Sequence, residues 1–123
     1  MNQKVRLHLI EVARKKGYIH YQELCNACGL GLNMSENPYD RLVIGEILGE
    51  ISEYEVDNGR PILSSIVITK SGEEGDGFYK LCESLGLGDW KKLKRDGTFS
   101  AITMNNTTEF WKNDNNYLKY RKI

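Results

Sequence analysis

Residues 37–69 read NPYDRLVIGEILGEISEYEVDNGRPILSSIVIT, and this stretch decides the fold that the sequence predicts. The dipeptide Asn37-Pro38 joins a favoured helix N-cap to a favoured first helical residue, so a helix should begin here. The dipeptide Asn58-Gly59 is a stop signal, so the helix should run to about Val56. Five apolar residues at helical spacing form its core-facing stripe: Ile44, Ile47, Leu48, Ile51 and Tyr54.

A stripe of small side chains, formed by Gly45, Gly49 and Ser52, runs beside the apolar stripe of this helix. Each glycine inside a helix costs ~1 kcal/mol relative to alanine. Two glycines one turn apart therefore indicate that something packs closely against the helix. We expect the partner to be a neighbouring helix.

The segments after the long helix predict a strand, a turn and another helix. Residues 62–69 are rich in β-branched side chains, which is typical of a buried strand. Residues 71–77, SGEEGDG, predict a glycine-rich acidic turn and lack the lysine of a phosphate-binding loop. Asp76 can cap the helix that follows. Its apolar face consists of Phe78, Leu81, Cys82 and Leu85.

Beyond residue 88 the expected elements are short. Asp89-Trp90 can open a helical turn, and residues 98–104 predict a strand. A last helix is expected from Thr107 or Thr108 to about Arg121. No internal repeat or linker divides the chain, so residues 1–123 should form a single domain.

Before the long helix, the pattern predicts a first helix over residues 2–16, an extended piece at 18–20 and a short helix over 21–28. This order resembles a winged helix-turn-helix, with residues 18–30, YIHYQELCNACGL, at the start of the helix-turn-helix. The resemblance implies that residues 62–78 form the wing. It covers about residues 2–80 and leaves residues 81–123 as a C-terminal helical extension. The expected fold class is therefore a helix-rich, winged-helix-like α+β domain with a small sheet and a C-terminal helix.

A second likeness is to small uncharacterised bacterial and phage proteins. It rests on residues 59–86, GRPILSSIVITKSGEEGDGFYKLCESLG, and on the later EFW at residues 109–111. This likeness implies a shared fold and no particular activity.

The long helix is strongly acidic, which departs from the winged-helix pattern. A DNA-reading helix is usually basic or polar, whereas residues 38–57 hold six acidic residues and one basic residue. The phosphates of a duplex would repel the acidic face. That face is either a solvated surface or a protein-interaction site, and it consists of Glu46, Glu50, Glu53 and Asp57.

Charge is unevenly distributed along a chain whose 17 basic and 17 acidic residues cancel. Residues 1–30 carry +3, residues 31–90 carry −8, and residues 91–123 carry +5. A basic field over the whole domain is therefore excluded. A local basic face can form if the fold brings the two ends together. Alternatively, the basic ends neutralise the acidic middle.

The last third of the chain is the best candidate for nucleic-acid contact. Basic groups interleaved with aromatic ones can neutralise phosphates and stack on bases. In the alternative, the aromatic residues Phe110, Trp111 and Tyr117 pack on the core. The candidate nucleic-acid-binding residues are Trp90, Lys91, Lys92, Lys94, Arg95, Lys119, Arg121 and Lys122.

Cys25 and Cys28 have a CxxC spacing, but structural zinc sites usually contain two such pairs. The remaining candidate ligands are His8, His20 and Cys82, so we expect both thiols to pack in the core and expect no metal or cofactor. Three cysteines, no apolar run of membrane-spanning length and no export signal favour a reducing cytoplasm.

Two functions follow from the charge pattern. The leading hypothesis is a non-enzymatic regulatory or accessory protein that contacts DNA or RNA through its basic ends. The alternative is a phage-type inhibitor or protein-interaction module that uses the acidic helix over residues 38–57 to bind a basic host enzyme. A small-molecule or nucleotide binder would require a convergent pocket. An enzyme is not expected, because no nucleophile, base and orienting group occur together.

Overall fold

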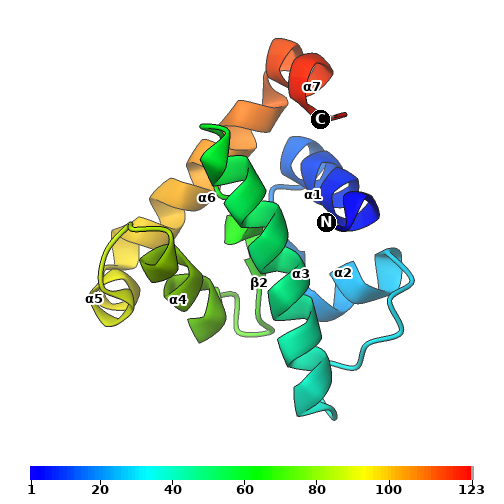
Figure 1. Cartoon of the computed structure of the whole chain (residues 1–123), viewed down its shortest axis with the longest axis vertical. Coiled ribbons are helices and arrows are strands. Elements are labelled where there is room, and N and C mark those ends of the chain that lie inside the picture. The colour runs from blue at the N-terminus through cyan, green and yellow to red at the C-terminus, as the bar shows by residue number, and fades with distance from the viewer. Residues whose placement is uncertain (123) are drawn as a thin grey trace.

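The computed structural model describes residues 1–122, of which about two thirds are helical. Two strands of two residues each accompany seven α-helices in this part of the chain (Figure 1). The elements in chain order are α1 (Gln3–Lys15), β1 (Ile19–His20), α2 (Tyr21–Ala27), α3 (Pro38–Asp57), the 3-10 turn η1 (Leu63–Ile66), β2 (Val67–Ile68), α4 (Asp76–Ser84), α5 (Trp90–Arg95), α6 (Gly97–Lys112) and α7 (Asp114–Tyr120).

The α+β, winged-helix-like fold class predicted from the sequence is wrong. The strands pair in parallel, Ile19 with Val67 and His20 with Ile68, and residues 1–122 contain no antiparallel wing. The expected strand at residues 62–69 begins as the η1 turn and contributes only β2. Directly after β2, Thr69 N donates to the Glu73 carbonyl at 2.7 Å, and this tight turn leads into α4 instead of a returning strand. The protein is therefore mostly all-α.

The expected strand at residues 98–104 is also wrong, because these residues lie within α6. The Asp96 side chain caps this helix by accepting from Thr98 N at 3.0 Å. Packing of α6 on α1 and η1 then outweighs the weak helix propensity of its β-branched residues. The single C-terminal helix predicted from Thr107 or Thr108 is instead divided at Asn113, which accepts from Asn116 N and so caps α7.

The first three helices match their predicted bounds within two residues. At the start of α3, the Asn37 side chain accepts from Tyr39 N at 3.0 Å, so the predicted cap is present. Gly17 has φ +93°, a left-handed conformation that suits the end of α1 and that other residues rarely adopt.

None of the helices in the described residues is both long and apolar enough to cross a membrane.

Two hydrophobic clusters organise the interior. The main core lies among α1, α2, α3, η1 and α6 and contains fully buried Trp111. A smaller cluster is formed around Phe78, Tyr79 and Cys82 of α4, with residues of α5 and the start of α6 packed against them. Figure 1 shows α6 running from α5 at one end to α7 at the other, so a single helix spans both clusters.

The buried carboxylate of Glu55 joins three distant segments. It pairs with Arg6 of α1 at 2.6 Å and with Arg60, which follows α3. The remaining nitrogens of Arg6 donate to the carbonyls of Tyr120 and Arg121 at 2.9 and 2.8 Å. Glu55 therefore does not belong to the exposed acidic face of α3.

Candidate functional site

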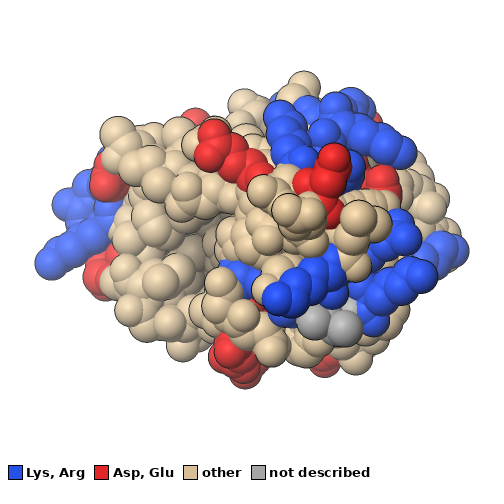
Figure 2. Space-filling model, turned by 90° about the horizontal axis from the view of Figure 1, so that it is seen from above, with Lys and Arg blue, Asp and Glu red and all other residues tan. Residues whose placement is uncertain are grey.

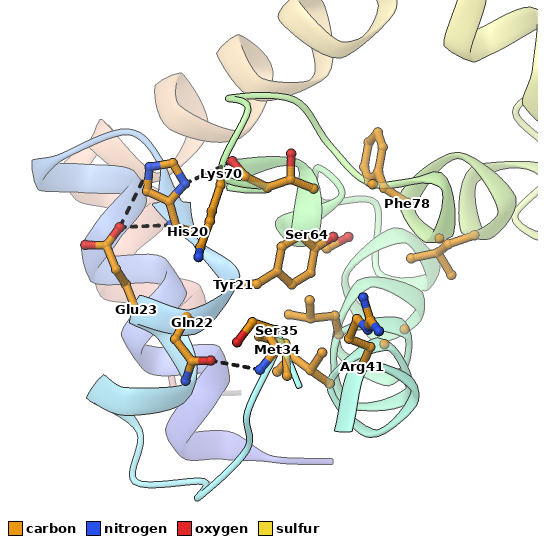
Figure 3. Close-up of a pocket in the computed structure, with 18 residues that line it drawn as sticks. His20, Tyr21, Gln22, Glu23, Met34, Ser35, Arg41, Ser64, Lys70 and Phe78 are labelled. Atoms are coloured by element: carbon orange, nitrogen blue, oxygen red, sulfur yellow. Dashed lines mark hydrogen bonds and ion pairs between the residues drawn. The ribbon is translucent and has the colours of Figure 1, made fainter. Parts of the chain in front are cut away.

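A groove of about 690 Å³ lies between α2, α3, α4 and the loop after β2 (Figure 3). Its apolar lining comes from Met34, Ile44, Leu48, Phe78 and Leu81. Polar side chains from α2, from the first turns of α3 and from the loop stand around this lining. These segments are far apart in the chain and meet only in the folded protein. We call this feature the α2–α3–α4 groove.

The pairing of β1 with β2 positions α2 along one wall of the groove. His20 ends β1, and its Nδ1 lies 3.0 Å from the Thr69 carbonyl. His20 N donates to the Glu23 carboxylate at 3.3 Å, which caps the start of α2. Tyr21 and Gln22 then follow in the first turn and line the groove.

Gln22 holds the loop between α2 and α3 in place. Its Nε2 donates to the Leu32 carbonyl at 2.9 Å, and its Oε1 accepts from Met34 N at 2.8 Å. Figure 3 shows the bond between Gln22 and Met34 at the lower edge of the groove. One amide side chain therefore fixes the wall that contains Met34 and Ser35.

Two glycines of α3 open the groove. A Cβ at Gly45 would meet nothing within 4 Å, and one at Gly49 would meet only Leu81 Cδ1 at 4.0 Å. The expectation of a neighbouring helix packed over these glycines is therefore wrong at Gly45. Close packing occurs one turn further on, where the Ser52 hydroxyl donates to the Ser64 hydroxyl at 2.8 Å.

The rim of the groove carries more positive than negative charge. Arg41 and Lys70 line it, and neither forms an ion pair with any residue in the described part of the chain. The carboxylate at the rim, Glu23, lies 3.6 Å from Lys16 Nζ and 4.0 Å from His20 Nε2. Lys16, which lies outside the groove lining, offsets the charge of Glu23.

Tyr21 is partly buried in the groove wall. Burial raises the pKa of its hydroxyl, and a hydrogen bond with the Gly75 backbone opposes this shift. The hydroxyl is therefore neutral at physiological pH and adds no charge to the site.

The structure places the eight predicted nucleic-acid-binding residues at two separate ends of α6. The 16 residues of α6 span about 24 Å, and Figure 2 shows separate groups of basic side chains around α7 and at the opposite edge. At the α5 end, Lys94 pairs with Asp76 at 2.6 Å. Half-buried Trp90 has Lys80 and Lys91 near its ring, at 5.0 and 5.7 Å.

At the other end, α7 lies beside the end of α1. Arg14 donates to the Trp111 carbonyl and to Asp114, both at 2.8 Å. The basic blocks from the two ends of the chain therefore meet here, although residues 91–95 do not join them. Within residues 1–122, no ion pair engages Lys119, Arg121 or Lys122. We call this surface the α1–α7 basic end.

The aromatic side chains near this end pack against the protein. Trp111 is fully buried, and the ring of Tyr120 stacks on Phe110 with centroids 5.9 Å apart. The Tyr117 ring has the guanidinium of Arg14 at 3.9 Å and that of Arg121 at 4.7 Å. Phe110 and Trp111 therefore follow the core-packing alternative, whereas the Tyr117 ring lies outside the main core and is covered by two guanidiniums.

The four predicted protein-interaction residues remain together as an exposed stripe on α3. Glu46, Glu50, Glu53 and Asp57 all face solvent. Among the described residues, the ion partner nearest to any of them is the terminal amine, 3.7 Å from Glu50. The stripe therefore stays acidic and is not neutralised by the basic ends.

The thiols lie apart from these surfaces. Cys25 and Cys28 are buried in the main core, as the core-packing interpretation predicted, and burial raises the pKa of both. Cys82 lies in the smaller cluster, where burial raises its pKa to about 12. No group of three or more potential metal ligands occurs in the part of the chain that the structure describes.

No protein-family model, curated protein or solved structure matches this chain. The function must therefore be inferred from the groove, the acidic stripe and the basic end. Sequence reasoning did not select the groove residues His20, Tyr21, Gln22, Arg41 and Lys70. The signal that pointed to this place was the spacing of Gly45 and Gly49: the helix surface is open at Gly45, and Gly49 faces Leu81 of α4.

Proposed function

We propose that this chain is a non-enzymatic binding protein that holds a small apolar ligand in the α2–α3–α4 groove. Small-molecule sites are typically concave, mostly apolar and about 300–1,000 Å³ in volume, with a few polar groups that orient the ligand. The groove has this size and this lining. The observation that carries the proposal is the open space over Gly45, where the helix surface is left uncovered.

A neutral apolar fluorophore, N-phenyl-1-naphthylamine, tests this proposal. We expect its emission to rise on mixing with the protein and to saturate. The variant Gly45→Leu places a side chain in the groove and also removes a glycine from a helix interior, which favours folding by ~1 kcal/mol. It should fold as well as the parent chain and lose the fluorescence response.

The matched control is Gly97→Leu, because a Cβ at Gly97 also meets nothing within 4 Å but the residue does not line the groove. This variant should keep the response. If Gly45→Leu binds the fluorophore as the parent does, or if the parent does not bind it, the proposed site is refuted.

A second function, nucleic-acid contact, is favoured by Lys119, Arg121 and Lys122 at the α1–α7 basic end, which form no ion pair within residues 1–122. Because the nearby aromatic rings are covered, we propose contact with phosphates and not with bases. Three phosphate contacts predict that log K falls with log salt with a slope of about −2.7 for duplex DNA. Gel shifts with Lys119→Gln/Lys122→Gln, and with Lys91→Gln/Lys92→Gln as the control, test this. No shift at low salt would remove the proposal.

A further inference from the structure

We propose that the ligand of the α2–α3–α4 groove is a small apolar carboxylate, with its charge held at the rim by Arg41 or Lys70 and its carbon chain on the apolar floor. This inference rests on the proposed function and specifies the chemistry of the ligand. It starts from the two cations that line the groove beside its apolar floor and have no ion partner in the described residues.

The two cations come from different elements, and both line the groove. Arg41 lies in the first turns of α3, and Lys70 follows β2. Figure 3 shows Lys70 on the α2 side of Tyr21 and Arg41 on the α3 side, so the two cations stand at opposite edges of the groove. An anionic headgroup at either edge would therefore meet one of these two cations.

The other polar groups of the lining are already engaged. Ser64 bonds to Ser52, and Gln22 bonds to the loop between α2 and α3. His20 Nδ1 contacts the Thr69 carbonyl. The lining carboxylate of Glu23 pairs with Lys16, so Arg41 and Lys70 are the charged lining groups left without an ion partner among residues 1–122, and both recognise anions.

Charge and shape together select a monocarboxylate with an apolar body. A guanidinium presents a planar pair of donors that match a carboxylate, and a lysine adds a compact positive charge. Positive charge at the mouth of an apolar hollow also raises the local concentration of anions. A nucleotide, which carries several charges and polar edges, would leave the apolar floor unused and many of its own groups unpaired.

Three ligands of equal chain length separate charge from apolar burial: decanoate, decanol and decylamine. Each is titrated against the full chain preloaded with N-phenyl-1-naphthylamine, and displacement is measured at low and high salt. We expect decanoate to bind about tenfold more tightly than decanol, because a charge-assisted hydrogen bond stabilises by about that factor. Decylamine should be the weakest, and salt should weaken decanoate alone.

The double variant Arg41→Gln/Lys70→Gln tests the assignment to these residues. It should fold normally and bind decanol as the parent does, but bind decanoate no better than decanol. The control variant Lys91→Gln/Lys92→Gln removes two charges from α5, outside the groove, and should keep the tenfold preference.

The outcomes distinguish this inference from the function on which it rests. Equal binding of decanoate and decanol by the parent chain would overturn the carboxylate proposal and leave the groove as a neutral apolar site. Absence of binding by all three ligands and the fluorophore would refute the groove as a ligand-binding site. Stronger displacement by an acidic helical peptide than by decanoate would overturn the small-molecule assignment.

Discussion

Arg6 of α1 and Glu55 of α3 form an ion pair in which both side chains are completely buried, with Nε 2.6 Å from Oε1. The other carboxylate oxygen of Glu55 pairs with Arg60. The remaining Arg6 donors reach the carbonyls of Tyr120 and Arg121, so each nitrogen of this buried guanidinium has a partner. The pair therefore joins the first helix, the long helix and the end of α7.

Replacing Glu55 by glutamine should destabilise the fold severely. The change leaves Arg6 and Arg60 buried without a neutralising charge, which costs about 3–5 kcal/mol. Urea unfolding monitored by circular dichroism measures the change in the free energy of unfolding. The control Glu53→Gln alters an exposed carboxylate on the same helix and should change stability by less than about 0.5 kcal/mol. Equal stabilities for the two variants would contradict a structural role for the pair.

Glu74 should make stability depend on pH. Burial raises the pKa of its carboxyl above the ordinary glutamate value of 4.5, so the folded chain keeps this proton to a higher pH than the unfolded chain. The protonated Glu74 carboxyl therefore contributes fully to the free energy of unfolding below about pH 4.5. This contribution is lost as the pH rises through the folded-state pKa.

Glu74→Gln should therefore unfold at a higher temperature than the parent at pH 7, by an amount corresponding to about 1 kcal/mol. The difference should shrink as the pH falls below 4.5. Thermal unfolding across this pH range measures the effect, and the exposed neighbour variant Glu73→Gln is the control. A Glu74→Gln variant less stable than the parent at pH 7 would show that the charged form is the favoured one.

The side chain of Gln22 should keep the loop between α2 and α3 in place along the groove. Gln22→Ala removes the two bonds that hold Leu32 and Met34, so the loop between α2 and α3 should loosen. We expect faster hydrogen exchange at the Met34 amide and weaker fluorophore binding, with a loss of about 1 kcal/mol of stability. Gln3→Ala, at an exposed position of α1, should leave all three measurements unchanged.

The acidic stripe allows a test of the protein-interaction alternative. Reversal of Glu46, Glu50 and Glu53 to lysine should abolish salt-sensitive capture of a basic partner from a bacterial lysate. Reversal of three other exposed carboxylates, Glu36, Glu83 and Glu109, should not. Equal capture by the two triple variants would count against a partner-binding role for the stripe.

Local signals explain which helices were predictable. Asn37-Pro38 marks the start of α3 and Asn58-Gly59 marks its end. Both signals are readable from sequence because helix caps depend on residues within one turn of the helix end. Residues 98–104 were mistaken for a strand because their helix depends on tertiary contacts further along α6. Thr107, for example, is fully buried, with its hydroxyl 2.7 Å from that of Ser65.

The missed wing and the missed groove have different physical causes. Residues 62–68 are all buried, and a continuously buried run does not reveal whether it forms a strand or a tight helical turn. The groove arises where α2, α3 and the segment after β2 meet, so no single stretch contains its pattern. Glu55 was left out of the predicted acidic face, but composition alone did not show that its carboxylate is buried with Arg6 and Arg60.

The groove lies along the seam between the two hydrophobic clusters. Ile44 and Leu48 on one side belong to the main core, whereas Phe78 on the other belongs to the smaller cluster beneath α4 and α5. A ligand in the groove would contact both hydrophobic clusters at once and so link them. Ligand binding would then couple the unfolding of the α4–α5 region to that of the main core, because the same contacts bind the ligand and join the two clusters.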